Sequence, residues 1–193
     1  MATEHGSAKL GPDLEQHARK WDHLQDHLKR FRQITGEFPM LVDEPDGYES
    51  RRPNVIYHLG GPVYTQVYGN FGETTKYYTI GPERDDTERD VVGNVKDKLL
   101  ERSVSEPAPA EDTEYEDRIQ ELLEEITVLE RDRNGRLSEL VQRLELGALE
   151  VTEETYEKIR YRLVRDIVGL GPLEPIMRDP ANEDVHVIGP SQV

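Results

Sequence analysis

A short stretch rich in glycine and proline, residues 169–180, restricts the fold of this chain more than any other part. It reads GLGPLEPIMRDP. Before it, apolar residues recur at the spacing of one helical face, at Tyr156, Ile159, Leu163 and Ile167. The glycines permit a tight exit from that helix, and Pro172 and Pro175 prevent an ordinary helical continuation. The pattern predicts a helix, an anchored turn and then a new element.

The residues after this turn predict a short strand. Asp179-Pro180 is a turn dipeptide. Residues 184–188, DVHVI, alternate as in a strand that carries Val185 and Val187 on one face. We expect residues 184–193 to be frayed or mispaired, because one strand without the rest of its sheet has an unpaired edge.

This order of features resembles the start of the N-terminal domain of type II/type IV secretion ATPases. These motors drive pilus assembly, archaellum assembly and protein secretion, and the acidic pair Glu183-Asp184 is most similar to the archaeal branch. Asn182 departs from the family, in which an aliphatic residue is expected. The resemblance implies a structural role, without catalysis, for the signature residues Gly169, Gly171, Pro172, Leu173, Asp179, Pro180, Glu183 and Asp184.

A second stretch, at residues 77–101, resembles the pre-domain of archaeal secretion ATPases. It reads YYTIGPERDDTERDVVGNVKDKLLE. In the family the strand commonly runs into Glu-Pro, where this chain has Gly81-Pro82.

The pattern as a whole predicts an α+β fold in consecutive parts. We expect a disordered tail at 1–12, a pre-domain at 13–102 and a linker at 103–113. A charged helical hairpin or kinked helix follows at 114–151, and an incomplete secretion-ATPase N-terminal domain occupies 152–193.

Within the pre-domain, apolar spacing predicts helices at 13–33 and 85–102. Alternating residues between glycine turns predict an antiparallel meander with strands at 54–59, 63–68 and 76–80.

Farther along, an a/d spacing predicts a helix through Ile119, Leu122, Ile126 and Leu129, which Asn134-Gly135 interrupts. Gly147 to Val151 is expected to be a break, and Thr152 is expected to cap the last helix.

The acidic charge of the chain argues against two classes of partner. Its 40 acidic and 24 basic residues give a net charge of −16, which repels nucleic acid and anionic membranes. The carboxylates are spread along the whole chain, so we favour adaptation to high salt, as in a halophilic archaeon, over an acidity suited to one partner. Cysteine is absent, which excludes disulfides and thiolate chemistry. We found no secretory signal and no membrane span, so we expect a cytoplasmic protein without membrane insertion.

The sequence lacks the phosphate loop of a nucleotide-hydrolysing site. Phosphate binding in the family needs a GxxxxGK[ST] loop, and the dipeptide Gly-Lys does not occur in this chain. We therefore expect no catalytic, cofactor-binding or metal-binding residues here and no ATP hydrolysis by this chain alone. The resemblance implies ATP and Mg²⁺ in the complete family member.

Other groups of residues have weaker functional interpretations. His23 and His27 lie one helical turn apart, a spacing that suits a metal, although a solvated helix face explains them more simply. His58 and His186 are expected to be packed or edge residues of strands. The tyrosines 57, 64, 68, 77 and 78 lack the interleaved basic residues that base stacking needs. Three arginines on the last helix are candidates for salt bridges, or for contacts with nucleotide or a neighbouring subunit, at Arg160, Arg162 and Arg165.

Two hypotheses for the function follow. In the first, the chain is the non-catalytic N-terminal region of a hexameric ATPase that powers type IV pilus or archaellum assembly or protein secretion. Its partners are then the C-terminal ATPase domain, neighbouring subunits of a ring and a membrane platform protein, through which it is associated peripherally with the membrane. In the second, it is a stand-alone acidic adaptor whose helices bind a partner helix.

Overall fold

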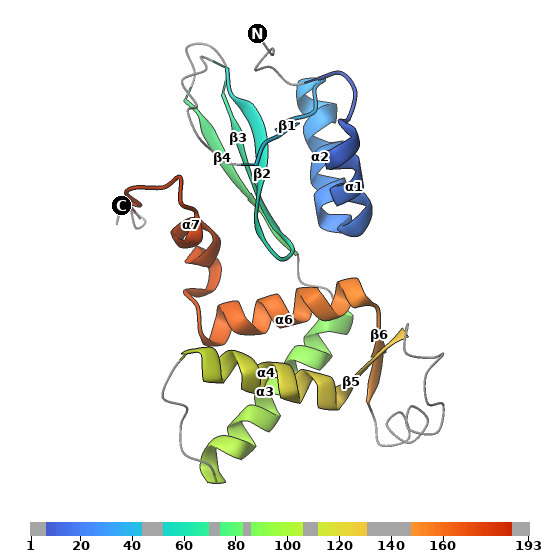
Figure 1. Cartoon of the computed structure of the whole chain (residues 1–193), viewed down its shortest axis with the longest axis vertical. Helices are drawn as coiled ribbons and strands as arrows, with labels where there is room; N and C mark the ends of the chain where they lie inside the picture. The colour runs from blue at the N-terminus through green and yellow to red at the C-terminus, as the bar shows by residue number, and fades with distance from the viewer. Residues whose placement is uncertain are drawn as a thin grey trace, which may run out of the picture. The chain divides into compact units, whose positions relative to one another are not determined.

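The computed structural model describes residues 7–43, 52–69, 74–82, 86–105, 112–130 and 148–186. Within these ranges the fold is α+β, as predicted, with six α-helices, a four-stranded mixed sheet and a two-stranded parallel sheet (Figure 1). The chain divides into two compact units. Unit 1 combines Met1–Gly81 with Pro172–Val193, and unit 2 comprises Pro82–Gly171, so unit 2 is an insertion in the sequence of unit 1.

Two helices, α1 (Pro12–Lys20) and α2 (Asp22–Thr35), replace the single helix predicted at 13–33. The backbone is extended at Trp21, with φ −125° and ψ 110°, and the indole is buried at this break. The prediction of one continuous helix was wrong because tertiary packing of the large indole overrides local helical propensity at this residue. Gly36 ends α2 in the left-handed conformation, and its N–H donates to the Arg32 carbonyl at 2.8 Å.

A four-stranded sheet forms the centre of unit 1, in the order β1-β2-β3-β4. Its strands are β1 (Met40–Leu41), β2 (Asn54–Gly60), β3 (Val63–Tyr68) and β4 (Lys76–Ile80). Strands β2, β3 and β4 pair antiparallel, which confirms the predicted meander. Strand β1, which the sequence pattern does not predict, pairs parallel with β2.

Alternation along the strands sends side chains to two faces of this sheet. Helices α1 and α2 lie over one face (Figure 1), where their apolar side chains pack on Ile56, Tyr64 and Ile80. The helices contribute Leu14, Ala18, Trp21, Leu24 and Leu28 to this core. The opposite face carries a second, smaller cluster built on Val55, Tyr57 and Val67.

Unit 2 is a helical layer with a small parallel sheet. It contains α3 (Asp86–Ser105), α4 (Asp112–Ile126), β5 (Thr127–Leu129), β6 (Leu149–Val151) and α6 (Glu153–Ile167). Its core joins side chains of the three helices, namely Val91, Val95, Ile119, Leu122, Leu123, Ile126, Ile159 and Leu163. The Thr152 hydroxyl accepts a hydrogen bond from the Thr155 N–H at 3.0 Å, which confirms the predicted cap of α6.

Two predictions within 114–151 were wrong. The helix predicted through Leu129 ends at Ile126, because the β-branched Thr127 and Val128 pair as a strand. The break predicted at Gly147 to Val151 contains strand β6, which pairs parallel with β5. Asn134-Gly135, the predicted kink, lies outside the described residues.

The segment after Gly171 belongs to unit 1, although the sequence pattern joins it to the preceding helix. It contains a 3-10 turn, η2 (Gly171–Leu173), and a short helix, α7 (Glu174–Arg178). In Figure 1, α7 lies on the side of the sheet opposite to α1 and α2. Residues 184–186 of the predicted final strand are irregular, and the rest of that strand lies outside the described residues.

The division into units differs from the expected boundaries at other points. Helix α3, which we grouped with the sheet in a pre-domain, contributes instead to the core of unit 2. Residues 7–12 of the tail predicted to be disordered at 1–12 are ordered, because Ser7 and Phe38 exchange two backbone hydrogen bonds of 3.0 and 2.8 Å. In the part of the chain that the structure describes, no helix has the length and apolar character needed to cross a membrane.

Candidate functional site

The most unusual group in the structure is the carboxylate of Asp179, the aspartate of the signature. Its side chain is only 2% exposed. Oδ2 accepts a hydrogen bond of 2.5 Å from the hydroxyl of Tyr57 on β2 and another from the hydroxyl of Tyr77 on β4. Oδ1 accepts the backbone N–H of Ala181 at 2.9 Å. Both oxygens of the carboxylate are therefore satisfied by donors.

These contacts explain how a carboxylate is tolerated on an otherwise apolar face. Burial of an ionised group is costly unless donors replace its hydration, and here two hydroxyls and one amide do so. Burial raises the pKa of Tyr77, and its bond to Asp179 raises that pKa further, so the Tyr77 hydroxyl keeps its proton and remains a donor. The arrangement therefore anchors the chain after α7 to two strands of the sheet.

Asn182, the departure from the family pattern, takes part in the same anchor. Its side-chain Nδ2 donates to the Ile176 carbonyl at 3.0 Å and to the Tyr77 hydroxyl at 3.4 Å. Its backbone N–H donates to the Asp179 carbonyl at 3.1 Å, which closes the turn. A polar side chain thus fits a position where an aliphatic residue was expected, because polar partners surround it.

The other signature residues shape the backbone or lie at the surface. Gly171 has φ 59°, a left-handed conformation that favours glycine. Gly169 donates its N–H to the Val164 carbonyl at 3.0 Å, at the end of α6. The signature residues that are exposed are Pro172, Leu173, Pro180, Glu183 and Asp184. Asp179 is thus the one member whose side chain is buried.

The three arginines of α6 do not converge on a common point. Arg162, 4% exposed, donates to the Pro82 carbonyl at 3.4 Å. Arg165 pairs with Asp166 at 2.8 Å and lies 5.8 Å over the ring of Tyr161. Arg160 is half-buried. Contacts of these residues with nucleotide or a neighbouring subunit stay a prediction.

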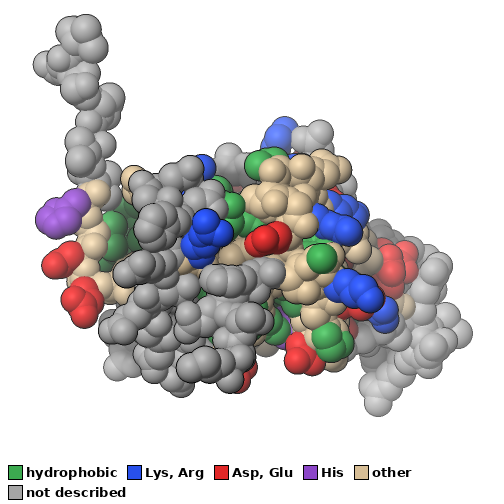
Figure 2. All heavy atoms as spheres, turned by 90° about the horizontal axis from the view of Figure 1, so that it is seen from above, with side chains coloured by type: hydrophobic (Ala, Val, Ile, Leu, Met, Phe, Trp, Pro, Cys, Tyr) green, Lys and Arg blue, Asp and Glu red, His purple; other side chains and the backbone are tan. Residues whose placement is uncertain are grey.

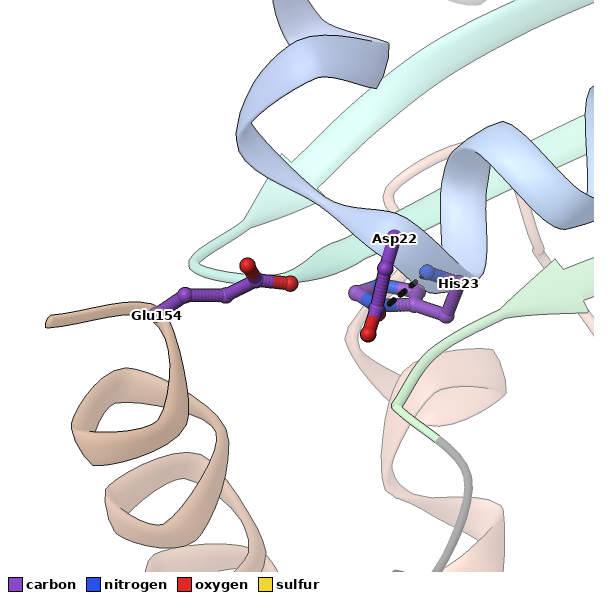
Figure 3. A group of neighbouring side chains, drawn as sticks. All are labelled: Asp22, His23 and Glu154. Carbon is purple, nitrogen blue, oxygen red and sulfur yellow. Dashed lines mark hydrogen bonds and ion pairs between the residues drawn. The ribbon is translucent and has the colours of Figure 1, made fainter. Parts of the chain in front are cut away.

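His23 and His27, for which a solvated helix face was the simpler interpretation, each form a hydrogen bond with a different residue. His23 Nε2–H donates to the Pro62 carbonyl at 2.7 Å, and His27 Nε2–H donates to Gln66 Oε1 at 2.6 Å. Asp22 Oδ1 accepts the His23 backbone N–H at 2.5 Å and lies 3.5 Å from His23 Nδ1 (Figure 3). Glu154, also labelled in Figure 3, belongs to unit 2 and pairs there with Lys158 at 2.7 Å.

The remaining candidates are placed as follows. His58 lies on β2, where its Nε2–H donates to the Gly61 carbonyl at 2.7 Å, and His186 is exposed in an irregular segment. Tyr57 and Tyr64 are fully buried, so neither offers a free ring to a base. On the face shown in Figure 2, basic, acidic and hydrophobic side chains of described residues are intermixed, without a continuous basic patch.

A buried chain of amide side chains was missed by the sequence analysis. Gln66 Nε2 donates to Asn54 Oδ1 at 3.0 Å, and Asn54 Nδ2 donates to the Phe38 carbonyl at 3.4 Å. Both side chains are buried, with exposed fractions of 0% and 3% for Gln66 and Asn54. In the alternation of β3, Gln66 lies on the same face as Tyr64 and Tyr68. This alternation was the only signal in the sequence that the polar side chain of Gln66 is buried.

Comparison with known proteins shows that this chain is similar in sequence to part of an archaeal protein. Uncharacterized protein MJ0900 of Methanocaldococcus jannaschii is 31% identical over 186 residues. The match covers 92% of this chain and 33% of the relative, so the chain spans about a third of that relative's length. No protein-family model matches the chain.

Proposed function

We propose that this chain is the non-catalytic N-terminal region of an archaeal secretion ATPase of the type II/type IV family. The complete protein would be a hexameric motor for type IV pilus or archaellum assembly, or for protein secretion. The observation that carries the proposal is the signature in residues 169–184, together with its geometry in this fold, where Asp179 is the buried anchor. An archaeal relative of about three times the aligned length supports it.

The role we propose for this region is assembly of the ring and coupling to a membrane platform protein. Such coupling requires a part of the protein to move as a rigid body when ATP binds elsewhere. In unit 1 the contacts of Asp179 with Tyr57 and Tyr77 hold α7 to the sheet. A displacement applied to α7 is therefore passed to the strands without separating this segment from them.

ATP binding and hydrolysis belong, in this proposal, to another part of the complete motor. The 193 residues contain no phosphate loop, so no residue of this chain is assigned to ATP or Mg²⁺. The arginines of α6 are kept as candidates for contacts with a neighbouring subunit, because Arg160 and Arg165 are only partly buried.

The first test is the coding sequence beyond Val193. An in-frame continuation that encodes GxxxxGK[ST] supports the motor. A stop codon at that point contradicts it and favours the stand-alone acidic adaptor, the second hypothesis from the sequence.

The second test uses the archaeal relative, both whole and without the third that aligns with this chain. We expect the shortened protein to retain basal ATP hydrolysis and to lose hexamer formation in light scattering. Absence of ATP hydrolysis in the whole relative would contradict the motor. Hexamers of normal size without the aligned third would contradict the assembly role.

A further inference from the structure

Three histidines of α1 and α2 lie where these helices meet the β2–β3 hairpin. His17, His23 and His27 each form a hydrogen bond with a residue of that hairpin. His58 lies on the hairpin itself, with its ring centroid 5.9 Å from that of His17. We call these four residues the histidine seam.

At the first part of the seam, His17 serves as an acceptor in a short chain of hydrogen bonds. The Tyr64 hydroxyl lies 2.6 Å from His17 Nδ1, and the oxygen of Tyr64 also takes a side-chain hydrogen bond from Trp21. Because an indole N–H only donates, the Tyr64 proton is available for the neutral imidazole of His17. A proton on Nδ1 of His17 would remove the acceptor for that hydroxyl.

At the second part of the seam, His27 begins the buried amide chain. Its Nε2–H donates to Gln66 Oε1, and Gln66 in turn donates to Asn54. The His27 ring also stacks on Phe31 at 6.1 Å and lies 5.9 Å from the ring of Tyr78. A charge on this ring would be enclosed by aromatic and amide groups, which stabilise an ionised side chain less well than water does.

Burial is the main cause that lowers the pKa of both histidines, and neighbouring groups modify this effect. Burial lowers the pKa of His17 from its ordinary 6.5, His58 and Lys20 lower it further, and Asp13 opposes them. Burial also lowers the pKa of His27, Arg30 adds to this, and the bond to Gln66 opposes it. A histidine with a lowered pKa binds fewer protons folded than unfolded. Its contribution to stability is therefore complete above pH 6.5 and declines as the pH falls below that value.

The two units differ in their content of histidine and tryptophan. All six histidines and the single tryptophan lie in the sequence of unit 1, and the sequence of unit 2 contains neither residue. Between about pH 5 and 7, histidine is the side chain whose ordinary pKa lies in the range. A pH change in this interval therefore titrates histidines in unit 1 alone, because the sequence of unit 2 contains none.

We propose that the histidine seam is an acid-operated switch, in which proton uptake by His17 and His27 releases α1 and α2 from the β2–β3 hairpin while unit 2 stays folded. The switch would expose Trp21 and the apolar face of the sheet. It goes beyond the proposed function and does not depend on it.

The test follows Trp21 emission, far-UV circular dichroism and unit 2 amide exchange from pH 8 to pH 5, at low and at molar salt. We expect a red shift of Trp21 emission below about pH 6.5, with retained protection of the α6 amides. The double variant His17→Gln with His27→Gln keeps side chains that form hydrogen bonds but do not titrate. It should abolish the shift. The matched control, His186→Gln, changes an exposed histidine and should leave the shift intact.

Histidine NMR of the unaltered protein keeps the proposal testable if the double variant does not fold. We expect the ring signals of His17 and His27 to titrate with midpoints below 6.5, together with the change at Trp21. Constant Trp21 emission down to pH 5 would overturn the proposal. So would a red shift that is accompanied by equal loss of protection in α6, because the two units would then open together.

Discussion

The hydroxyl of Tyr57 donates a hydrogen bond of 2.5 Å to Oδ2 of Asp179, a residue 122 positions later in the chain. The whole of unit 2 lies between these two residues in the sequence. Unit 1 is therefore completed by a segment that follows the insertion. This relation explains why the Asp-Pro dipeptide of the signature has a structural role in this chain: its aspartate connects the segment after α7 to the sheet.

Replacement of the buried carboxylate should weaken unit 1. Asp179→Asn replaces one buried carboxylate oxygen with an NH2 group, which cannot accept the hydrogen bonds that the oxygen accepted. The negative charge that strengthens these bonds is also lost. We expect a loss of about 2–3 kcal/mol in the free energy of unfolding, measured by denaturant titration of Trp21 fluorescence. The control Asp184→Asn alters an exposed carboxylate of the same segment and should change stability by less than about 0.5 kcal/mol. Equal effects of the two variants would contradict the assignment.

The bond between Tyr57 and Asp179 should appear as a coupling in a double-mutant cycle. Tyr57→Phe removes the donor without changing the ring, and Asp179→Asn alters the acceptor. We expect the two stability losses to be non-additive by about 1 kcal/mol, because both variants remove the same contact. A cycle of Tyr57→Phe with Asp184→Asn provides the additive reference, and additivity in both cycles would argue against the contact.

The amide chain through Gln66 should be intolerant of an apolar replacement. Gln66→Leu has a similar volume, yet it leaves His27 and Asn54 without their partner inside the fold. Each buried group left unpaired costs about 1–3 kcal/mol, so a large fall in the denaturation midpoint is expected. Gln25→Leu, at an exposed position of α2, serves as the comparison and should be nearly neutral. If both variants were equally stable, the chain would contribute little to the stability of unit 1.

Tyr64 should make unit 1 sensitive to alkali. Burial raises its pKa from 10.0 to about 12, so the folded protein holds the phenol proton more tightly than the unfolded chain does. The stability that this proton contributes to unit 1 is therefore complete below pH 10 and is lost as the pH rises through about 12. Tyrosinate absorbance should show phenols that titrate late, together with exposure of Trp21, and both Tyr64 and Tyr77 belong to this group. Tyr64→Phe should reduce the late absorbance change, and an unchanged amplitude would contradict the assignment to Tyr64.

Local patterns predicted the elements whose periodicity is unambiguous. The meander was found because valine and tyrosine alternate between glycine turns, and the cap of α6 because Thr152 precedes two glutamates. The break at Trp21 was missed because an indole is compatible with a helix until its packing is known. The strands β5 and β6 were missed because Thr127 and Leu149 are partners across a wide sequence separation.

The anchor at Asp179 could not be derived from spacing. An Asp-Pro dipeptide predicts a turn at the surface, and Tyr57 and Tyr77 are ordinary strand residues. Only the three-dimensional structure brings the three side chains together, because their separations of 122 and 102 residues leave no local signal. The same holds for the seam, where the helical spacing of His23 and His27 suggested a solvated face and the hairpin covers it instead.

The central structural claim is that the signature segment is part of the fold of unit 1. Native-state amide hydrogen exchange tests it most directly, through the N–H groups of Ala181 and Asn182, which donate to Asp179. We predict that they are protected and open together with the amides of β3, and that Asp179→Asn accelerates both sets. Exchange of Ala181 and Asn182 at the rate of an unstructured peptide, while β3 stays protected, would contradict the claim.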